Sequence, residues 1–116
     1  MNIGKTLSIN SSNEWRKWLS KNHGKEKDIW VIFYKKVTGK QTMSIRETVD
    51  EAICFGWIDS IEKGIDKEEF ALRFSPRRPN SIWSKINIER VKKLIKEKKM
   101  TKVGLDKVNK NIIDES

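Results

Sequence analysis

The sequence predicts an α+β fold: a small antiparallel sheet of three or four strands, with helices packed on one face and a helical C-terminal tail. Two observations lead to this prediction. Four segments carry hydrophobic residues at helical spacing, and the stretches 29–34 and 57–75 carry the β-branched and aromatic residues typical of strands. The length of 116 residues suits one domain, and 36% hydrophobic residues allow a buried core. We therefore assign 1–116 to a single domain.

Two helices are predicted in the first half of the chain. Each begins with a capping box, in which a serine and a glutamate three residues later satisfy free backbone N–H groups. Ser11 with Glu14 begins the first helix, and Ser44 with Glu47 begins the second. A glycine follows each helix and favours its end there. The expected buried stripes are Trp15, Trp18 and Leu19 in the first helix, and Ile45, Val49, Ala52 and Ile53 in the second.

The predicted strands surround these helices. Residues 7–9 could form a short first strand, and 29–34, apolar on both faces, suit a central strand. The following stretch predicts a hairpin with its turn near 63–67. With the turn centred near Ile65, Trp57 would lie opposite Arg73. One face would then carry the core residues Ile58, Phe70, Leu72 and Phe74, and the other would carry Trp57, Asp59, Ala71 and Arg73.

The C-terminal part is predicted to be helical. From about Asn87, hydrophobic residues recur at helical spacing, and the outer face of this helix is rich in lysine. A last helix, roughly 101–113, is expected to close the chain. The residues predicted to face the core are Ile88, Val91, Leu94, Ile95, Val103, Leu105, Val108 and Ile112.

The net charge of +9 is concentrated in one segment. Residues 73–102 contain four arginines, seven lysines and two glutamates, which gives +9, so the rest of the chain sums to zero. Such a segment creates a positive field that attracts anionic partners. We therefore expect an anionic small molecule, nucleic acid or an anionic lipid surface to contact Arg73–Lys102, and a protein partner remains an alternative.

Several classes of protein are disfavoured. The single Cys54 cannot form an internal disulfide, and together with one histidine it cannot supply a structural zinc site. No apolar run approaches the roughly 18 residues of a membrane span, and the first residues lack the apolar stretch of a secretory signal. We expect a cytoplasmic location. The sequence contains no recognisable cofactor, metal or catalytic motif, and Cys54 is expected to be a buried structural thiol.

Most of the chain resembles the YdeI/OmpD-associated, or bacteriocin-protection, family. The segments that carry the resemblance are CFGWIDS (54–60), RFSPRRPNSIWS (73–84) and N-x-x-R (87–90), with EWRKWL (14–19), WVIFYKK (30–36) and MTKVGL (100–105). The resemblance implies a part in resistance to bacteriocins and cationic antimicrobial peptides, and it implies no catalytic residues. Members are often periplasmic, a location not carried over to this chain because it shows no export signal.

The most concentrated candidate site is the segment 73–84, in which prolines 76 and 79 restrict the backbone around Arg77 and Arg78. Guanidinium groups bind phosphate or carboxylate with two hydrogen bonds, and tryptophan offers a stacking surface. The predicted ligand-binding residues are Trp57, Asp59, Arg73, Arg77, Arg78, Trp83 and Arg90. Together they predict a non-enzymatic module that binds an anion in a basic pocket lined by aromatic rings.

Three alternatives remain open from the sequence. In the first, Arg73 and Arg77 only brace the hairpin by pairing with Asp59 and nearby carboxylates, while Trp83 fills the core. In the second, the chain is a small enzyme for an anionic substrate, with Asp59 as general acid or base. In the third, it is a stress-related or envelope-associated protein-interaction domain. The lysine-rich helix face is by itself most simply a solvated face.

Overall fold

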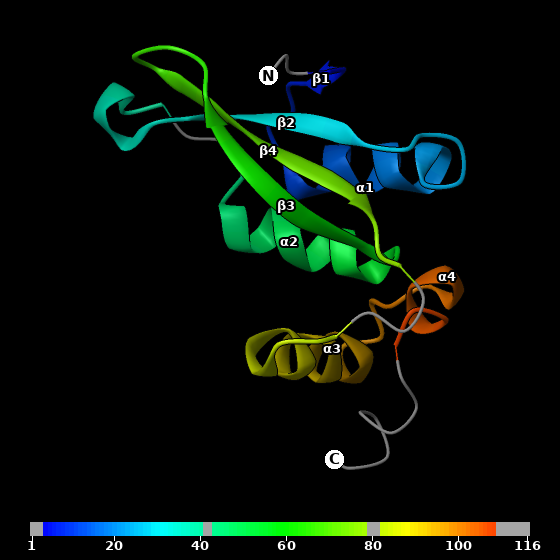
Figure 1. Cartoon of the computed structure of the whole chain (residues 1–116). Helices are drawn as coiled ribbons and strands as arrows, with labels where there is room; N and C mark the ends of the chain where they lie inside the picture. Colours follow the sequence, from blue (N-terminus) through cyan, green and yellow to red (C-terminus); the bar gives the residue numbers. More distant parts are fainter. Residues whose placement is uncertain (1–3, 41–42, 79–81, 109–116) are drawn as a thin grey trace.

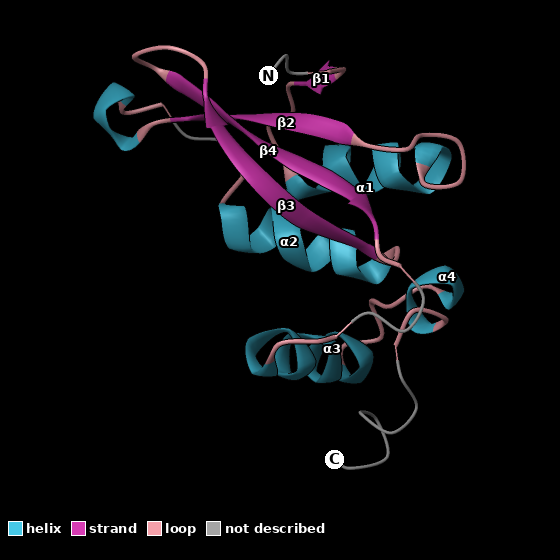
Figure 2. Cartoon of the chain, in the orientation of Figure 1, coloured by secondary structure: helices cyan, strands magenta, loops and turns pink. Residues whose placement is uncertain are grey.

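A computed structural model describes residues 4–40, 43–78 and 82–108 and confirms the α+β class (Figures 1 and 2). The elements are β1 (Thr6–Leu7), α1 (Ser12–Asn22), β2 (Ile29–Tyr34), the 3₁₀ turn η1 (Lys36–Thr38), α2 (Ile45–Cys54), β3 (Trp57–Gly64), β4 (Glu69–Pro76), α3 (Lys85–Lys96) and α4 (Lys102–Leu105). The predicted central strand and the hairpin turn are confirmed.

The four strands lie in the order β1-β2-β4-β3. The pairs β2–β4 and β3–β4 are antiparallel, as predicted, but β1 runs parallel to β2, so the sheet is mixed. The reason is the connection: α1 carries the chain back across the sheet before β2 begins, and such helical crossovers join parallel neighbours.

The predicted hairpin register is wrong. Trp57 pairs with Pro76 instead of Arg73, and Asp59 pairs with Phe74. Two local features shift the pairing: the turn is centred nearer Lys67, and a bulge interrupts β3 between Asp59 and Glu62. Between Trp57 and Asp59 the pairing is shifted by three residues, and an odd shift moves these side chains to the opposite face, whereas beyond the bulge the shift is four and the face is unchanged. Trp57 therefore faces the core and Ile58 the other side, the reverse of the prediction.

Helices α1 and α2 cover one face of the sheet (Figure 1). Trp15 of α1 meets Phe74 edge to face, with ring centroids 5.3 Å apart, and Trp18 meets Trp57 in the same way at 5.8 Å. The indole N–H of Trp15 donates to the Thr48 carbonyl oxygen at 2.9 Å. The two fully buried tryptophans of the described residues, Trp15 and Trp57, thus have specific partners in the core.

Both predicted N-caps are confirmed, because Ser11 and Ser44 accept from the backbone N–H groups of Glu14 and Glu47. The stripe of α2 is confirmed at Val49, Ala52 and Ile53. It is wrong at Ile45, which is 42% exposed, since this first residue of the helix projects beyond the edge of the core.

The C-terminal helices begin near the predicted positions. Helix α3 starts two residues early, at Lys85, because Ser84 caps it by accepting from the Asn87 N–H. The last helix is short. The N–H groups of Lys107 and Val108 bond to carbonyls three residues back, and this tighter winding ends the helix. The rest of the predicted helix, from 109, lies outside the described residues.

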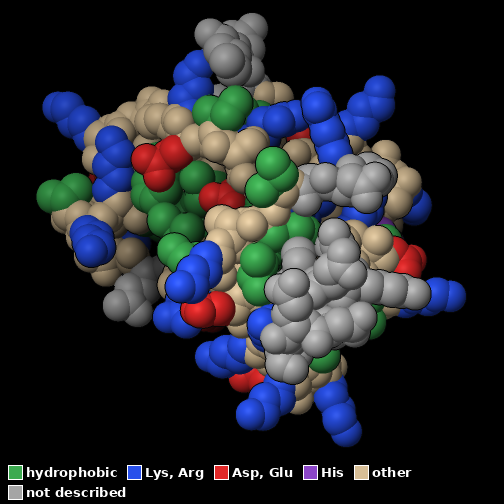
Figure 3. Space-filling model, turned by 60° about the horizontal axis from the view of Figure 1, so that its bottom comes forward, with side chains coloured by type: hydrophobic (Ala, Val, Ile, Leu, Met, Phe, Trp, Pro, Cys, Tyr) green, Lys and Arg blue, Asp and Glu red, His purple; other side chains and the backbone are tan. Residues whose placement is uncertain are grey.

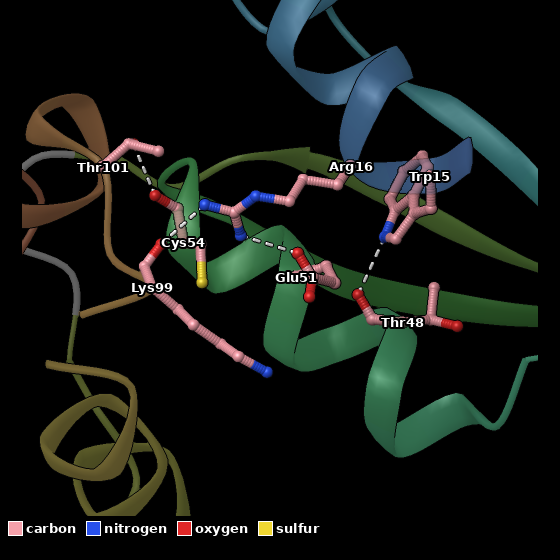
Figure 4. Close-up of polar contacts among 7 residues, drawn as sticks. All are labelled: Trp15, Arg16, Thr48, Glu51, Cys54, Lys99 and Thr101. Carbon is pink, nitrogen blue, oxygen red and sulfur yellow. Dashed lines mark hydrogen bonds and ion pairs between the residues drawn. The ribbon is translucent and has the colours of Figure 1, made fainter. Parts of the chain in front are cut away.

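One side chain ties α1 to α2 and to the C-terminal segment. The Arg16 guanidinium donates to the Glu51 carboxylate and to the Lys99 carbonyl oxygen, at 2.8 Å each (Figure 4). Beside it, the Thr101 hydroxyl donates to the Cys54 carbonyl oxygen at 2.5 Å. These contacts fix the C-terminal segment against the end of α2.

Candidate functional site

The residues predicted to line one pocket are distributed over four parts of the molecule. Trp57 is 1% exposed and belongs to the core. Arg73, on the opposite face of the sheet, forms an ion pair with Asp28, whose Oδ2 lies 3.0 Å from its Nε. Arg90 lies between α2 and α3. The single pocket drawn from the sequence is therefore not formed, and what remains together is the group of Arg77, Arg78 and Trp83.

Arg77 is held in place by its backbone and by its side chain. Its N–H donates to the Gly56 carbonyl oxygen at 2.8 Å, which fixes the end of β4 to the turn before β3. Its guanidinium carbon lies 3.7 Å from the centre of the Trp83 ring, and Nη2 donates to the Ile82 carbonyl oxygen at 3.0 Å. Such a stack presents the guanidinium in one orientation.

Burial lowers the pKa of the Arg77 guanidinium below its ordinary value, because an apolar environment disfavours the charged form. The group nevertheless remains protonated at neutral pH, since arginine titrates far above it. The side chain is only 6% exposed.

A cavity of about 410 Å³ opens next to this stack. Its described lining consists of Ile58, Ser75, Pro76, Arg77, Arg78, Ile82, Ser84 and Asn87. Two arginines and no carboxylate are present in this lining, so the cavity is electropositive. Arg78 is exposed and can move toward a ligand. We call this cavity the arginine site; Pro79, which was predicted to brace it, lies outside the described residues.

The arginine site also contains polar groups that the sequence prediction missed. Ser75, Ser84 and Asn87 line it, and Asn87 accepts from the Arg90 guanidinium at 3.5 Å through Oδ1, which leaves its Nδ2 group as a donor toward other partners. The signal for Ser84 was present in the sequence, because a serine directly before a segment with helical spacing is typical of an N-cap. The adjacent N-terminus of α3 adds partial positive charge.

Arg90 lines a different cavity, of about 530 Å³, between α2 and α3. Its Nε lies 3.8 Å from Oδ1 of Asp50, an atom that is buried and accepts no hydrogen bond from the described residues. The cavity contains the basic residues Arg46, Arg90, Lys93 and Lys99 and the acidic residues Glu47, Asp50, Glu51, Glu89 and Glu97. Because charges of both signs compensate there, this cavity does not favour an anion.

The remaining candidate residues, Asp59 and Cys54, lie outside the arginine site. Asp59 is half-buried and does not line the arginine site, so nothing in the geometry supports a role for it as general acid or base. Cys54 is fully buried, as predicted, and burial raises the pKa of its thiol, which disfavours the reactive thiolate. The bracing alternative is right that Arg73 pairs with a carboxylate, although the partner is Asp28 and not Asp59, and it is right that Trp83 belongs to the core.

The fold and the site define a small α+β domain whose electropositive cavity lies where the sheet meets its basic C-terminal segment. A family model described as a domain of unknown function (DUF8412) matches residues 7–107, and the chain belongs to this family. No curated protein and no solved structure matches the chain. Among the described residues, no helix is long and apolar enough to cross a membrane.

Proposed function

We propose that this chain is a non-enzymatic binding module that receives an anionic group, phosphate or carboxylate, at the arginine site. The observation that carries the proposal is a cavity whose described lining contains Arg77 and Arg78 but no carboxylate. Arg77 is already oriented by Trp83 before a ligand arrives, so little conformational entropy is lost on binding. The resemblance to the bacteriocin-protection family and the cytoplasmic location remain predictions.

The lysines of the C-terminal segment extend the positive surface beyond the cavity. Residues 85, 92, 93, 96, 98, 99 and 102 are lysines, and none of them forms an ion pair with the described residues. Basic side chains project around the face in Figure 3. A ligand that carries several phosphates, such as a nucleic acid, would therefore gain contacts that a single phosphate cannot make.

The test compares two arginine variants that remove the same charge. Wild type, Arg78→Gln and Arg46→Gln are heated with inorganic phosphate, pyrophosphate, phosphorylated metabolites and short oligonucleotides at low and high ionic strength. Both arginines are exposed, so neither change should disturb the fold. We expect anion-dependent stabilisation in wild type and Arg46→Gln, and its loss in Arg78→Gln. Equal stabilisation of both variants, or none in wild type at low salt, would contradict the proposal.

A protein-interaction domain is the second candidate, and one observation favours it. Ile82, which lines the arginine site, is 95% exposed, and Ile86, in the first turn of α3, is 65% exposed. Exposed apolar residues with a polar surround are typical of protein contacts. The two functions differ in salt dependence: a contact through isoleucines should survive high ionic strength, whereas anion binding should not.

A further inference from the structure

A third cavity, of about 740 Å³, lies at the opposite end of the sheet from the arginine site, and we call it the apolar cavity. It is formed where β2 ends, η1 turns and α2 begins, and Phe70 of β4 closes it. This volume is within the range of small-molecule pockets, which extends from roughly 300 to 1,000 Å³. No residue of the arginine site lines this cavity, and the proposed function does not depend on it.

Hydrophobic side chains form most of this cavity. The rings of Phe33 and Phe70 are stacked, with centroids 5.4 Å apart and an interplanar angle of 18°. Tyr34, Met43 and Ile45 complete the apolar part of the lining. Ile45, which projects beyond the edge of the core, thus forms a wall of the cavity. Figure 3 shows hydrophobic side chains gathered in a hollow on the side where η1 and the start of α2 lie.

Basic side chains surround this apolar lining. Lys35, Lys36 and Lys40 line the cavity, against one carboxylate, Glu47. Glu47 is engaged in its own helix cap, where its Oε1 accepts from the Ser44 hydroxyl at 3.1 Å. The Lys40 ammonium lies 4.9 Å from the centre of the Tyr34 ring and forms a long, exposed ion pair with Glu68 at 3.8 Å. The Lys35 ammonium donates to the Asp66 carbonyl oxygen at 2.7 Å, so the lining keeps an excess of positive charge of which Lys36 carries the most accessible part. The rim therefore favours a negative charge, while the interior favours an apolar body.

We infer that this cavity binds a small organic monoanion with an apolar body, such as a medium-chain fatty acid or an aromatic carboxylic acid. The body would lie on Phe33 and Phe70 and the carboxylate among the lysines. Two terms then contribute to affinity. Burial of each further methylene group should raise affinity about fourfold until the cavity is filled, and the charge term should weaken with salt.

The experiment uses the whole chain and isothermal titration with hexanoate, octanoate, decanoate and 2-naphthoate, each below its aggregation concentration. Octylammonium is the control, because it has as many carbons as octanoate and carries the opposite charge. We expect affinity to rise from hexanoate to octanoate and octylammonium to bind at least tenfold more weakly. The naphthoate arm distinguishes an aromatic from an alkyl body. No binding of any acid at millimolar concentration, or equal binding of octylammonium, would overturn the inference.

Matched variants locate the ligand. Ile45→Glu places a carboxylate at the cavity wall, where it is compatible with a helix start, and should abolish octanoate binding. Ile65→Glu is the control, because Ile65 is equally exposed, at 41% against 42%, but lies in the hairpin turn and does not line the cavity. Lys36→Gln should weaken binding several-fold, and Lys17→Gln, on α1, should not. Equal octanoate affinity of Ile45→Glu and Ile65→Glu would contradict this placement.

The two proposals can fail separately. Arg78→Gln removes a charge from the arginine site and should leave octanoate binding unchanged, whereas Ile45→Glu should leave the stabilisation by phosphate compounds unchanged. If Arg78→Gln abolished octanoate binding, the acid would be bound at the arginine site and the apolar cavity would have no assigned ligand.

Discussion

In the sheet and its two helices, several basic side chains lie against carboxylates, whereas along α3 the lysines lie toward solvent. Arg16 pairs with Glu51 at 2.8 Å and Arg73 with Asp28 at 3.0 Å. The lysines of α3 make no such pair with the described residues. The first region thus uses charge to hold elements together, and the second leaves its charge available for a partner. The two regions should respond differently to substitution.

The largest expected loss is in the first region, at Trp57. This ring is fully buried against Trp18, so Trp57→Ala should lower the free energy of unfolding by about 3–5 kcal/mol. Urea denaturation followed by circular dichroism measures the change. If the alanine variant does not fold, Trp57→Phe, which keeps a ring, should fold with a smaller loss. A change below about 1 kcal/mol in Trp57→Ala would mean that the ring is not part of the core.

The contact between the two regions is tested at Gly104. A Cβ added at this position would approach the Cys54 carbonyl oxygen to 2.2 Å, so the backbone of α4 could not remain against the end of α2. Gly104→Ala should cost about 1–3 kcal/mol, the range for overpacked sites. Gly64→Ala is the control, because nothing lies within 4 Å of its added Cβ. Equal thermal stability of the two variants would contradict the close approach.

Arg73, in β4, and Arg78, just after β4, allow a charge with a structural role to be distinguished from a charge that binds a ligand. The ion pair of Arg73 is partly exposed, so Arg73→Gln should cost no more than about 1 kcal/mol. It should leave the stabilisation by phosphate compounds unchanged, because Arg73 does not line the arginine site. Arg78→Gln should leave the stability without ligand unchanged and should abolish the stabilisation by phosphate compounds. Loss of phosphate-dependent stabilisation in Arg73→Gln would mean that the anion lies along β4 at Arg73 and not in the arginine site.

The sequence predicted most of the fold because local signals decided it. Helix caps at Ser11 and Ser44, the strand 29–34 and the hairpin turn are each determined by residues close in sequence. The hairpin register could not be predicted in the same way, because it depends on a bulge between Asp59 and Glu62. The residues around this bulge carry no sequence signal for it. That shift moved Trp57 from the expected site into the core.

The site was predicted only in part, for a related reason. Composition located the positive charge in 73–102, but charge pairing depends on residues distant in sequence. Asp28 reaches Arg73 across 45 positions and Asp50 reaches Arg90 across the α2–α3 contact. The apolar cavity was missed because Ile45 fits the helical stripe and so was interpreted as core. The three-dimensional arrangement of the strand and helix ends is needed to show that Ile45 lies beside Phe33, Phe70 and three lysines.

The smallest expected effect concerns Asp50, at the contact of α2 with α3. Burial raises the pKa of its carboxyl above the ordinary value of 3.8, although Arg90 and other nearby cations oppose this. The folded state therefore binds this proton more readily than the unfolded state, and stability falls as the pH rises above about 3.8. Asp50→Asn should thus be more stable than wild type at pH 7, by less than about 1 kcal/mol because the pair that it removes is long and partly exposed.

This gain should shrink toward zero in acid, where the wild-type carboxyl is also uncharged. Thermal unfolding of wild type, Asp50→Asn and the exposed control Glu62→Gln between pH 3 and pH 8 measures it. A lower stability of Asp50→Asn at pH 7 would mean that attraction to Arg90 outweighs the cost of burial. In that case α3 would be held to α2 by charge, as the sheet region is, and the contrast between the two regions would be confined to the lysines.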